Sequence, residues 1–375
     1  MQQETIHGYR LSPQQKRLWL LQQSELDHSY RVRCLIEIAG ELEVKILEQA
    51  LENIVGGHEI LRTTFQLLPG MTIPVQVLAD EPAVSLHRDD LTQLSWDDQA
   101  AKIDQLFSDA GSCQADYTHL PLLRADLLRL GDRRHLLIIS SPALCMDGPS
   151  LRYVMRQVAD VYEALRRTRE PARTAAMQYA DFAEWQNELL ESGEAAAGRQ
   201  YWKPNDLSAS FGQRLVFERP SQARCFQTSA IAVEISSKST LALGKVANDC
   251  GVAVSTFLLA CWQTVLWRSS GWENVIVGAE FDGRKFAELK DAIGLLSSYL
   301  PLAAELTGDL QFKDLLRRLG GQQHEAQRWQ EYFSWDQFAP NDDAAGFLHY
   351  RFPFCFEARH QPAEIQLGGL RFSFQ

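Results

Sequence analysis

The stretch from Arg134 to Leu151 restricts the possible folds of this chain more than any other part of its sequence. The apolar run Leu136–Ile139 has the length of a strand and ends at a Ser-Ser-Pro turn signal, so it predicts a buried strand. Asp147 with Pro149 two residues later predicts a helix start in which the aspartate is the N-cap. A loop between a buried strand and a helix N-terminus is a common place for chemistry.

The rest of the chain mixes hairpins with amphipathic helices. The helix after Pro149 has one apolar face and is expected to end near Arg167. Strands expected at 123–130 and 135–139 form a hairpin, and this mixture predicts an α+β fold in which helices cover a sheet. The second half repeats this layout, with strands expected at 231–235, 275–279, 300–306, 349–356 and 370–374. A chain of 375 residues is also too long for an average single domain, so two lobes are expected.

Composition excludes several classes of protein. Hydrophobic residues make up 45% and charged residues 23% of the chain, which is typical of a soluble globular protein. The sequence has no apolar run of spanning length and its start lacks a signal-peptide core, and the seven cysteines show no zinc-ligand spacing. A net charge of −11 argues against binding nucleic acid or an anionic membrane. We therefore expect a cytoplasmic protein without a metal site.

The loop before the helix resembles a known motif. Condensation domains of nonribosomal peptide synthetases, which belong with the chloramphenicol acetyltransferase-like acyltransferases, carry His-His-x-x-x-Asp-Gly after a strand and before a helix. Aligned on Asp147 and Gly148, the loop has Pro142 and Ala143 where the family has its two histidines. The Asp-Gly pair is kept, and both histidines are replaced.

Four more strings resemble motifs of the same family, in the family's order and at similar spacing. Leu11–Leu20 is similar to the opening motif, and His58–Phe65 to the motif His-Glu-x-Leu-Arg-Thr-x-Phe. Tyr179–Trp185 is similar to an aromatic-x-Asp-aromatic-Ala-x-Trp string, and Ile293–Leu302 to the fifth motif, which commonly has Asn-Thr where this chain has Ser298-Tyr299. The resemblance therefore covers most of the chain.

The resemblance implies two chloramphenicol acetyltransferase-like lobes, each a mixed sheet covered by helices, arranged as a V with a central tunnel. We expect an N-terminal lobe at 1–170, a linker at 171–177 and a C-terminal lobe at 178–375 that lacks the family's final strand and helix. The implied partners are acyl or peptidyl carrier proteins and neighbouring synthetase modules. No cofactor is expected to bind directly, because the carriers bring their own phosphopantetheine arms.

The resemblance also assigns roles to individual residues. Asp147 is expected to pair with Arg284 of a Gly-Arg segment in a structural ion pair, in addition to capping the helix. The expected tunnel lining comprises Ala143, Cys145, Ser297, Ser298 and Tyr299. No catalytic residue is assigned, because Ala143 stands where the family's histidine acts as a base or positions the amine.

Three other groups have both a structural and a functional interpretation. Cys145 lies near a helix N-terminus, which favours a nucleophilic thiolate, but free cysteine is usually a small buried apolar residue. His58 is expected to support a turn, and His349 has no context that suggests a role. A basic cluster is either a solvated helix end or a docking point for an acidic carrier protein; it comprises Arg166, Arg167, Arg169 and Arg173.

Three functions remain open at this point. The chain is a condensation-type domain that forms amide or ester bonds with altered or residual catalysis, since aminolysis of a thioester can proceed by proximity alone. Alternatively, it is an inactive condensation-like domain that docks carrier proteins or recruits another enzyme. An acyl-CoA acyltransferase of the same superfamily is disfavoured, because those enzymes also rely on the motif histidine.

Overall fold

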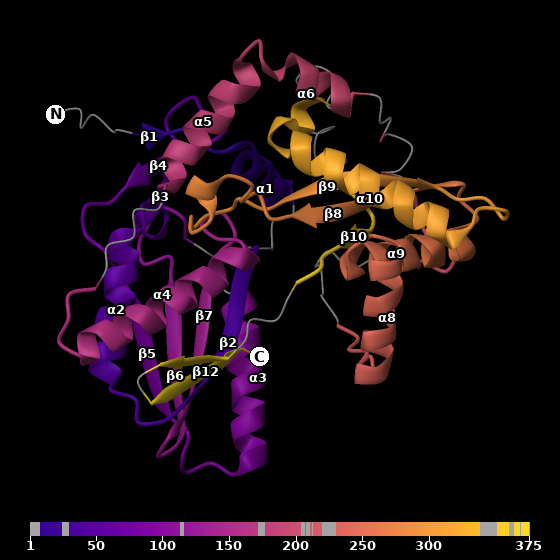
Figure 1. The fold of residues 1–375 in the computed structure, drawn as a ribbon. Helices are drawn as coiled ribbons and strands as arrows, with labels where there is room; N and C mark the ends of the chain where they lie inside the picture. Colours follow the sequence, from indigo (N-terminus) through magenta and orange to yellow (C-terminus); the bar gives the residue numbers. More distant parts are fainter. Residues whose placement is uncertain are drawn as a thin grey trace. The chain divides into compact units, whose positions relative to one another are not determined.

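The computed structural model forms two compact units (Figure 1). Unit 1 combines three parts of the chain, Met1–Glu188, Arg284–Ser297 and His360–Gln375, and unit 2 contains Leu189–Gly283 and Ser298–Arg359. The structure describes residues 8–24, 30–112, 116–171, 177–203, 207, 211, 213–219, 230–337, 351–359, 364–367 and 369–374. The linker predicted at 171–177 lies largely outside these residues and stays a prediction, as do the V-shaped arrangement and its tunnel.

Unit 1 is built on a six-stranded sheet in the order β11-β12-β2-β7-β6-β5 (Figure 1). Its neighbouring strands are antiparallel except for the parallel pair β5 and β6. The strands are β2 (Arg31–Ala39), β5 (Ser85–Asp90), β6 (Arg124–Gly131), β7 (Arg134–Pro142), β11 (Ile365–Leu367) and β12 (Leu370–Phe374). The predicted hairpin at 123–139 is therefore present as β6 and β7, with β7 three residues longer at its C-terminal end than the predicted 135–139.

Helices cover both faces of this sheet. Successive side chains of β7 point to opposite faces, so both faces carry apolar residues that pack against helices. Leu136 and Ile138 pack with Leu128 in a cluster beside α3 (Trp96–Ser112). Leu137 and Ile139 instead join the main core under α2 (Val44–Gly57) and α4 (Gly148–Arg166), which pack on one another. This arrangement places the end of β7 and the start of α4 against the main core.

A smaller sheet, in the order β1-β4-β3, completes unit 1 with four helical segments. Its strands are β1 (Gly8–Tyr9), β3 (Thr63–Gln66) and β4 (Val75–Leu78). The helical segments are α1 (Pro13–Ser24), the single turns η1 (Glu59–Arg62) and η2 (Ala287–Leu289), and the first part of α5 (Tyr179–Glu191).

Unit 2 contains a three-stranded sheet in the order β10-β8-β9, with α9 and α10 packed on it. β8 is parallel to β10 and antiparallel to β9, and Gln263 of α9 donates hydrogen bonds to Leu302 O at 2.9 Å and Val275 O at 3.4 Å. The elements are α6 (Ala195–Trp202), α8 (Ser237–Asp249), α9 (Val254–Ser270), β8 (Asn274–Phe281), β9 (Ser298–Glu305), α10 (Phe312–Trp329), η3 (Gln330–Tyr332), η4 (Trp335–Gln337) and β10 (Cys355–Phe356).

Two strands predicted for the second half differ from the structure. The segment 231–235 is assigned to no strand, and Ile231 and Val233 are 91% and 80% exposed. Alternating apolar residues make a strand only where a neighbouring strand pairs with them, and that pairing is a tertiary effect. The strand expected at 349–356 is reduced to β10, and residues 349 and 350 lie outside the described part.

No single helix in the described residues is long and apolar enough to cross a membrane, although α8 and α9 together, bent by 98°, meet the length and composition required.

Candidate functional site

The loop between β7 and α4 is fixed at three points of its backbone. Ala143 N donates to Tyr30 O at 2.8 Å, and Asp147 N donates to Gly294 O at 3.1 Å. Gln15 Nε2 of α1 donates to Leu144 O at 2.8 Å. Because these partners come from three distant parts of the chain, the loop has its shape imposed by the tertiary structure of unit 1.

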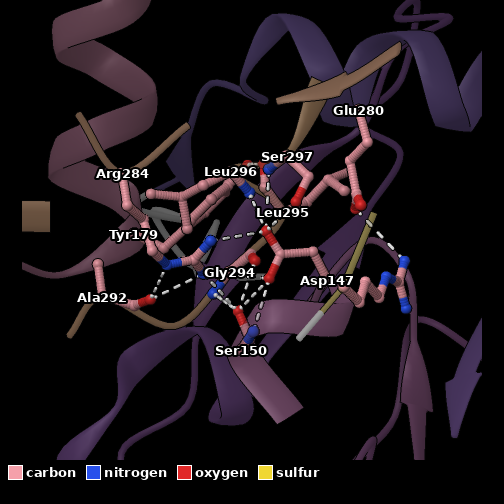
Figure 2. Close-up of polar contacts among 11 residues, drawn as sticks. Asp147, Ser150, Tyr179, Glu280, Arg284, Ala292, Gly294, Leu295, Leu296 and Ser297 are labelled. Carbon is pink, nitrogen blue, oxygen red and sulfur yellow. Dashed lines mark hydrogen bonds and ion pairs between the residues drawn. The ribbon is translucent and has the colours of Figure 1, made fainter. Parts of the chain in front are cut away.

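The Asp147 carboxylate is the centre of a network that also includes the segment 284–297 (Figure 2). Its Oδ1 accepts from Ser150 N at 2.8 Å and from Arg284 Nη2 at 3.0 Å. Its Oδ2 accepts from Arg284 Nη1 at 3.1 Å, and from the backbone N–H groups of Leu296 and Ser297 at 3.0 and 2.9 Å. One carboxylate therefore both caps α4 and holds a segment more than a hundred residues away in sequence.

The ion pair of Asp147 and Arg284 is deeply buried, with 3% and 2% of the respective side chains exposed. Burial by itself would raise the pKa of Asp147, but the charge and hydrogen bonds of Arg284, with those of Ser150, hold that pKa below its usual range. The carboxylate therefore stays ionised and acts as a structural anion, with every lone-pair direction occupied.

Ser150 and Tyr179 complete the attachment of this segment. Gly294 N donates to Ser150 Oγ at 3.1 Å, and Tyr179 Oη donates to Leu295 O at 2.8 Å while it contacts Ser12 Oγ at 2.7 Å. Gly294 has a φ of +156°, and its bare Cα packs on the Tyr179 ring, which leaves no room for a side chain. The close approach to Tyr179 thus explains why the string Ile293–Leu302 has a glycine at position 294.

The loop carries no side chain that can exchange a proton near neutral pH. Pro142 is buried and Ala143 partly exposed, and neither has a titratable group. Cys145 is fully buried, and burial raises the pKa of its thiol to about 12 in spite of the opposing charge of Arg31. Among the described residues, no group of three metal-ligating side chains is present either. The loop therefore offers no acid or base that could exchange a proton with a bound group near neutral pH.

We expect Cys145 to resist alkylation in the folded protein. With its thiol buried and its pKa near 12, the reactive thiolate is scarce at neutral pH, so iodoacetamide should label Cys145 far more slowly than a model thiol. Peptide mass spectrometry over a time course measures this rate, and the same protein in denaturant is the control that should label at the model rate. Fast labelling of the folded protein would instead support the role of Cys145 as a nucleophilic thiolate.

The residues predicted to line a tunnel fall in both units. Ala143, Cys145 and Ser297 belong to unit 1, where Ser297 Oγ donates to Asp147 Oδ2 at 2.9 Å. Ser298 and Tyr299 begin β9 in unit 2, where Tyr299 Oη donates to the carboxylate of Glu357. Tunnel lining stays a prediction for all five residues.

The remaining sequence candidates have simpler surroundings. His58 is the C-cap residue that follows α2, is 4% exposed, and its Nε2 lies 2.7 Å from Gln157 Oε1. His349 and Arg173 lie outside the described residues. Arg166, Arg167 and Arg169 are exposed at and just beyond the end of α4, where Arg167 pairs with Glu163.

Because of His58, the free energy of unfolding of unit 1 should decrease as the pH falls. Burial lowers the pKa of this histidine from 6.5, against a smaller opposing effect of Gln157, so the unfolded chain binds the proton more tightly than the folded one. The stabilising contribution is present above pH 6.5 and is lost as the pH falls through the lower folded pKa. Urea unfolding of wild type and His58→Gln across this range measures it: their difference should change with pH, and parallel curves would contradict the prediction.

Several residues that shape the site were not singled out from the sequence. Gln15, Ser150 and Tyr179 each hold the loop or its partner segment, and Gln15 and Tyr179 lie in strings that resemble family motifs. Ser150, three residues after Asp147, fits a local capping pattern that could have identified it.

A family model described as Condensation domain matches residues 5–333. Bacitracin synthase 3 of Bacillus licheniformis is 30% identical over 324 residues, and bacitracin synthase 2 of the same organism is 28% identical over 330 residues. These matches cover 85% and 86% of this chain but only 5% and 12% of the two relatives. The chain therefore spans a small part of the length of the curated relatives that it matches.

Solved structures share the fold at low sequence identity. The first condensation domain of the calcium-dependent antibiotic synthetase, in complex with a substrate analogue, has a TM-score of 0.81 and 20% identity, over 98% of this chain and 84% of that one. The X-domain in complex with OxyB from teicoplanin biosynthesis has a TM-score of 0.69 and 20% identity, over 100% of this chain and 81% of that one. These likenesses confirm the predicted α+β fold.

Proposed function

Since this chain belongs to the condensation-domain family, we propose that it joins substrates held as thioesters on the carrier proteins of a nonribosomal peptide synthetase, by positioning them without a histidine base. The observation that supports this proposal is that the loop keeps its hydrogen-bonded framework although it has no histidine that could act as a base. The Asp147 network keeps the loop in a single shape, whereas Ala143 offers no proton acceptor. The phosphopantetheine arms of the carriers would bring both reactants.

The chemistry does not require a base in the protein. The lone pair of the acceptor amine attacks the thioester carbonyl, the C–N bond forms, and the C–S bond breaks as the thiolate leaves. The amine proton passes to the leaving thiolate or to water. Holding the reacting atoms in contact replaces a bimolecular step by an effectively unimolecular one, which alone accelerates such reactions strongly. Loss of one acid–base group costs about 10²–10⁴ in rate, so a slow but measurable reaction is expected.

The test uses two carrier proteins, one loaded with an acyl group and one with an amino acid. Intact-protein mass spectrometry follows acylation of the acceptor carrier with and without the domain. We expect acylation above the buffer control. Absence of acylation under conditions where the domain binds both carriers would overturn catalysis.

The second candidate function is a docking or recruitment platform without catalysis. It is favoured by the same loop, because neither Pro142 nor Ala143 can transfer a proton. The fold is also that of an X-domain whose solved structure is a complex with OxyB, so the fold is compatible with binding a partner protein. Tight carrier binding without acyl transfer is the result that this function predicts.

A further inference from the structure

Unit 2 exposes a short apolar segment immediately before α8. Ile231, Val233 and Ile235 are 91%, 80% and 52% exposed, although they alternate with Ala232 and Glu234 as in a strand that is buried on one face. The backbone of 231–235 makes no hydrogen bond to another described residue. A row of unpaired N–H and C=O groups beside exposed apolar side chains is a template for pairing with another strand.

The helix that follows this segment is exposed as well. α8 is bent by 98° from α9 and extends away from it (Figure 1). The structure describes every residue of α8, and Ala247 is the one that is buried, whereas Leu241 is 76% exposed. Single exposed apolar residues are common in soluble proteins, but a series of them that is continuous along the chain marks a place where another surface binds.

The sequence of the segment is complementary to itself in one antiparallel register. When Val233 lies opposite Val233 of another copy, Ile231 lies opposite Ile235, and the apolar side chains of both strands share one face. Glu234 then lies opposite Ala232. Centring the pairing on Glu234 would instead place two like charges directly opposite one another, which destabilises a pair of strands.

The apolar area of this surface suits a small dimer interface. Fully burying one Val, Leu or Ile side chain removes about 60–120 Å² of apolar surface from water. Ile231, Val233, Ile235 and Leu241 therefore supply about 250–500 Å² in each copy, and the paired backbone adds to this area. Specific interfaces begin at about 600 Å² in each partner, so a dimer formed here lies at the lower limit and dissociates in the micromolar range.

We propose that residues 231–235 pair, as antiparallel strands centred on Val233, with the same residues of a second copy of this chain. The second copy provides the neighbouring strand without which the alternating pattern of 231–235 forms no strand in a single chain. Both copies use the same residues, so the interface has twofold symmetry and closes at two chains. This dimer goes beyond the proposed function and does not depend on it.

Sedimentation velocity of the whole chain over a range of concentrations tests the dimer. We expect a reversible exchange of monomer and dimer with a Kd of about 1–100 µM. Val233→Lys places two like charges opposite one another at the twofold axis, so it should weaken the dimer by about 10-fold or more. Leu67→Lys changes an apolar side chain of unit 1 that is 55% exposed; it is the matched control and should leave the Kd unchanged.

Cysteine cross-linking tests the register. Two cysteines at position 233 lie directly opposite one another in the proposed pairing, with Cβ atoms about 4.5–5.5 Å apart, from which a small shift allows a disulfide. Position 234 faces its own copy only diagonally, at about 7–8 Å, so Glu234→Cys is the matched control. Under mild oxidation Val233→Cys should form a covalent dimer and Glu234→Cys should not. Peptide mass spectrometry distinguishes this bond from one at the exposed Cys355.

The proposal is overturned if the chain remains monomeric at every concentration, and the surface is then left to a strand of another polypeptide. It is also overturned if Val233→Lys leaves the Kd unchanged, because the contact then lies elsewhere. A series of species larger than the dimer contradicts twofold closure. Equal cross-linking of the two cysteine variants contradicts the register, and with it the pairing that the sequence specifies.

Discussion

Ala143→His should raise the rate of acyl transfer between two loaded carriers by about 10²–10⁴. The main chain at this position is already fixed, since Ala143 N donates to Tyr30 O at 2.8 Å, and the side chain is partly exposed. An imidazole attached there can accept the proton of the attacking amine, which the thiolate or water must otherwise take. The measurement is a mass-spectrometric time course of acceptor acylation.

The pH profile distinguishes a new base from a simple change of shape. Acyl transfer by Ala143→His should increase as the pH rises through the pKa of an ordinary histidine, about 6.5. Ala143→Leu, which adds bulk without a titratable nitrogen, is the control and should show neither the increase nor the profile. If the histidine and leucine variants behave alike, the loop has lost more than its base, and the docking function is preferred.

Asp147→Ala should destabilise unit 1 by about 3–5 kcal/mol. The substitution leaves Arg284, with 2% of its side chain exposed, without the carboxylate it pairs with, and it removes the acceptor of the Leu296 and Ser297 N–H groups. The midpoint of urea unfolding, followed by circular dichroism, measures the loss. Asp160→Asn, an exposed position on the same helix, should leave the midpoint nearly unchanged.

A double-mutant cycle tests whether the loss of stability comes from the unpaired charge of Arg284. Asp147→Leu combined with Arg284→Met removes both charges at once, so it should cost less than Asp147→Leu alone. Additive effects of the two substitutions would mean that the ion pair contributes nothing beyond its separate members, and would contradict the prediction.

Local patterns in the sequence were sufficient to predict the elements that flank the loop. The predicted helix from Pro149 to about Arg167 corresponds to α4 (Gly148–Arg166), and Asp147 is its N-cap, as expected from residue type and spacing. These predictions hold because a capping aspartate and an apolar face act over one or two helical turns.

The partners of Asp147 could not be read from such patterns. Arg284 was predicted as a partner only from the resemblance to a family. Leu296 and Ser297 contribute backbone N–H groups, which every residue type except proline has, so the sequence does not identify them. Contacts between positions more than a hundred residues apart are set by how the whole chain folds. The same reasoning explains 231–235, where a strand-like pattern is present without a pairing strand.

The composition of unit 1 from three separate parts of the chain has a consequence for its synthesis. β2 pairs with β12, so this pairing cannot form until Leu370–Phe374 have been synthesised. The ion pair of Asp147 likewise cannot form until Arg284 has been synthesised. A ribosome therefore has to deliver the polypeptide as far as β12 before the first-made half can reach its native state. Until then, the nascent chain exposes the unpaired edge of β2 and the carboxylate of Asp147, both of which are paired in the folded domain. Expression of this domain should therefore benefit from slow production at low temperature.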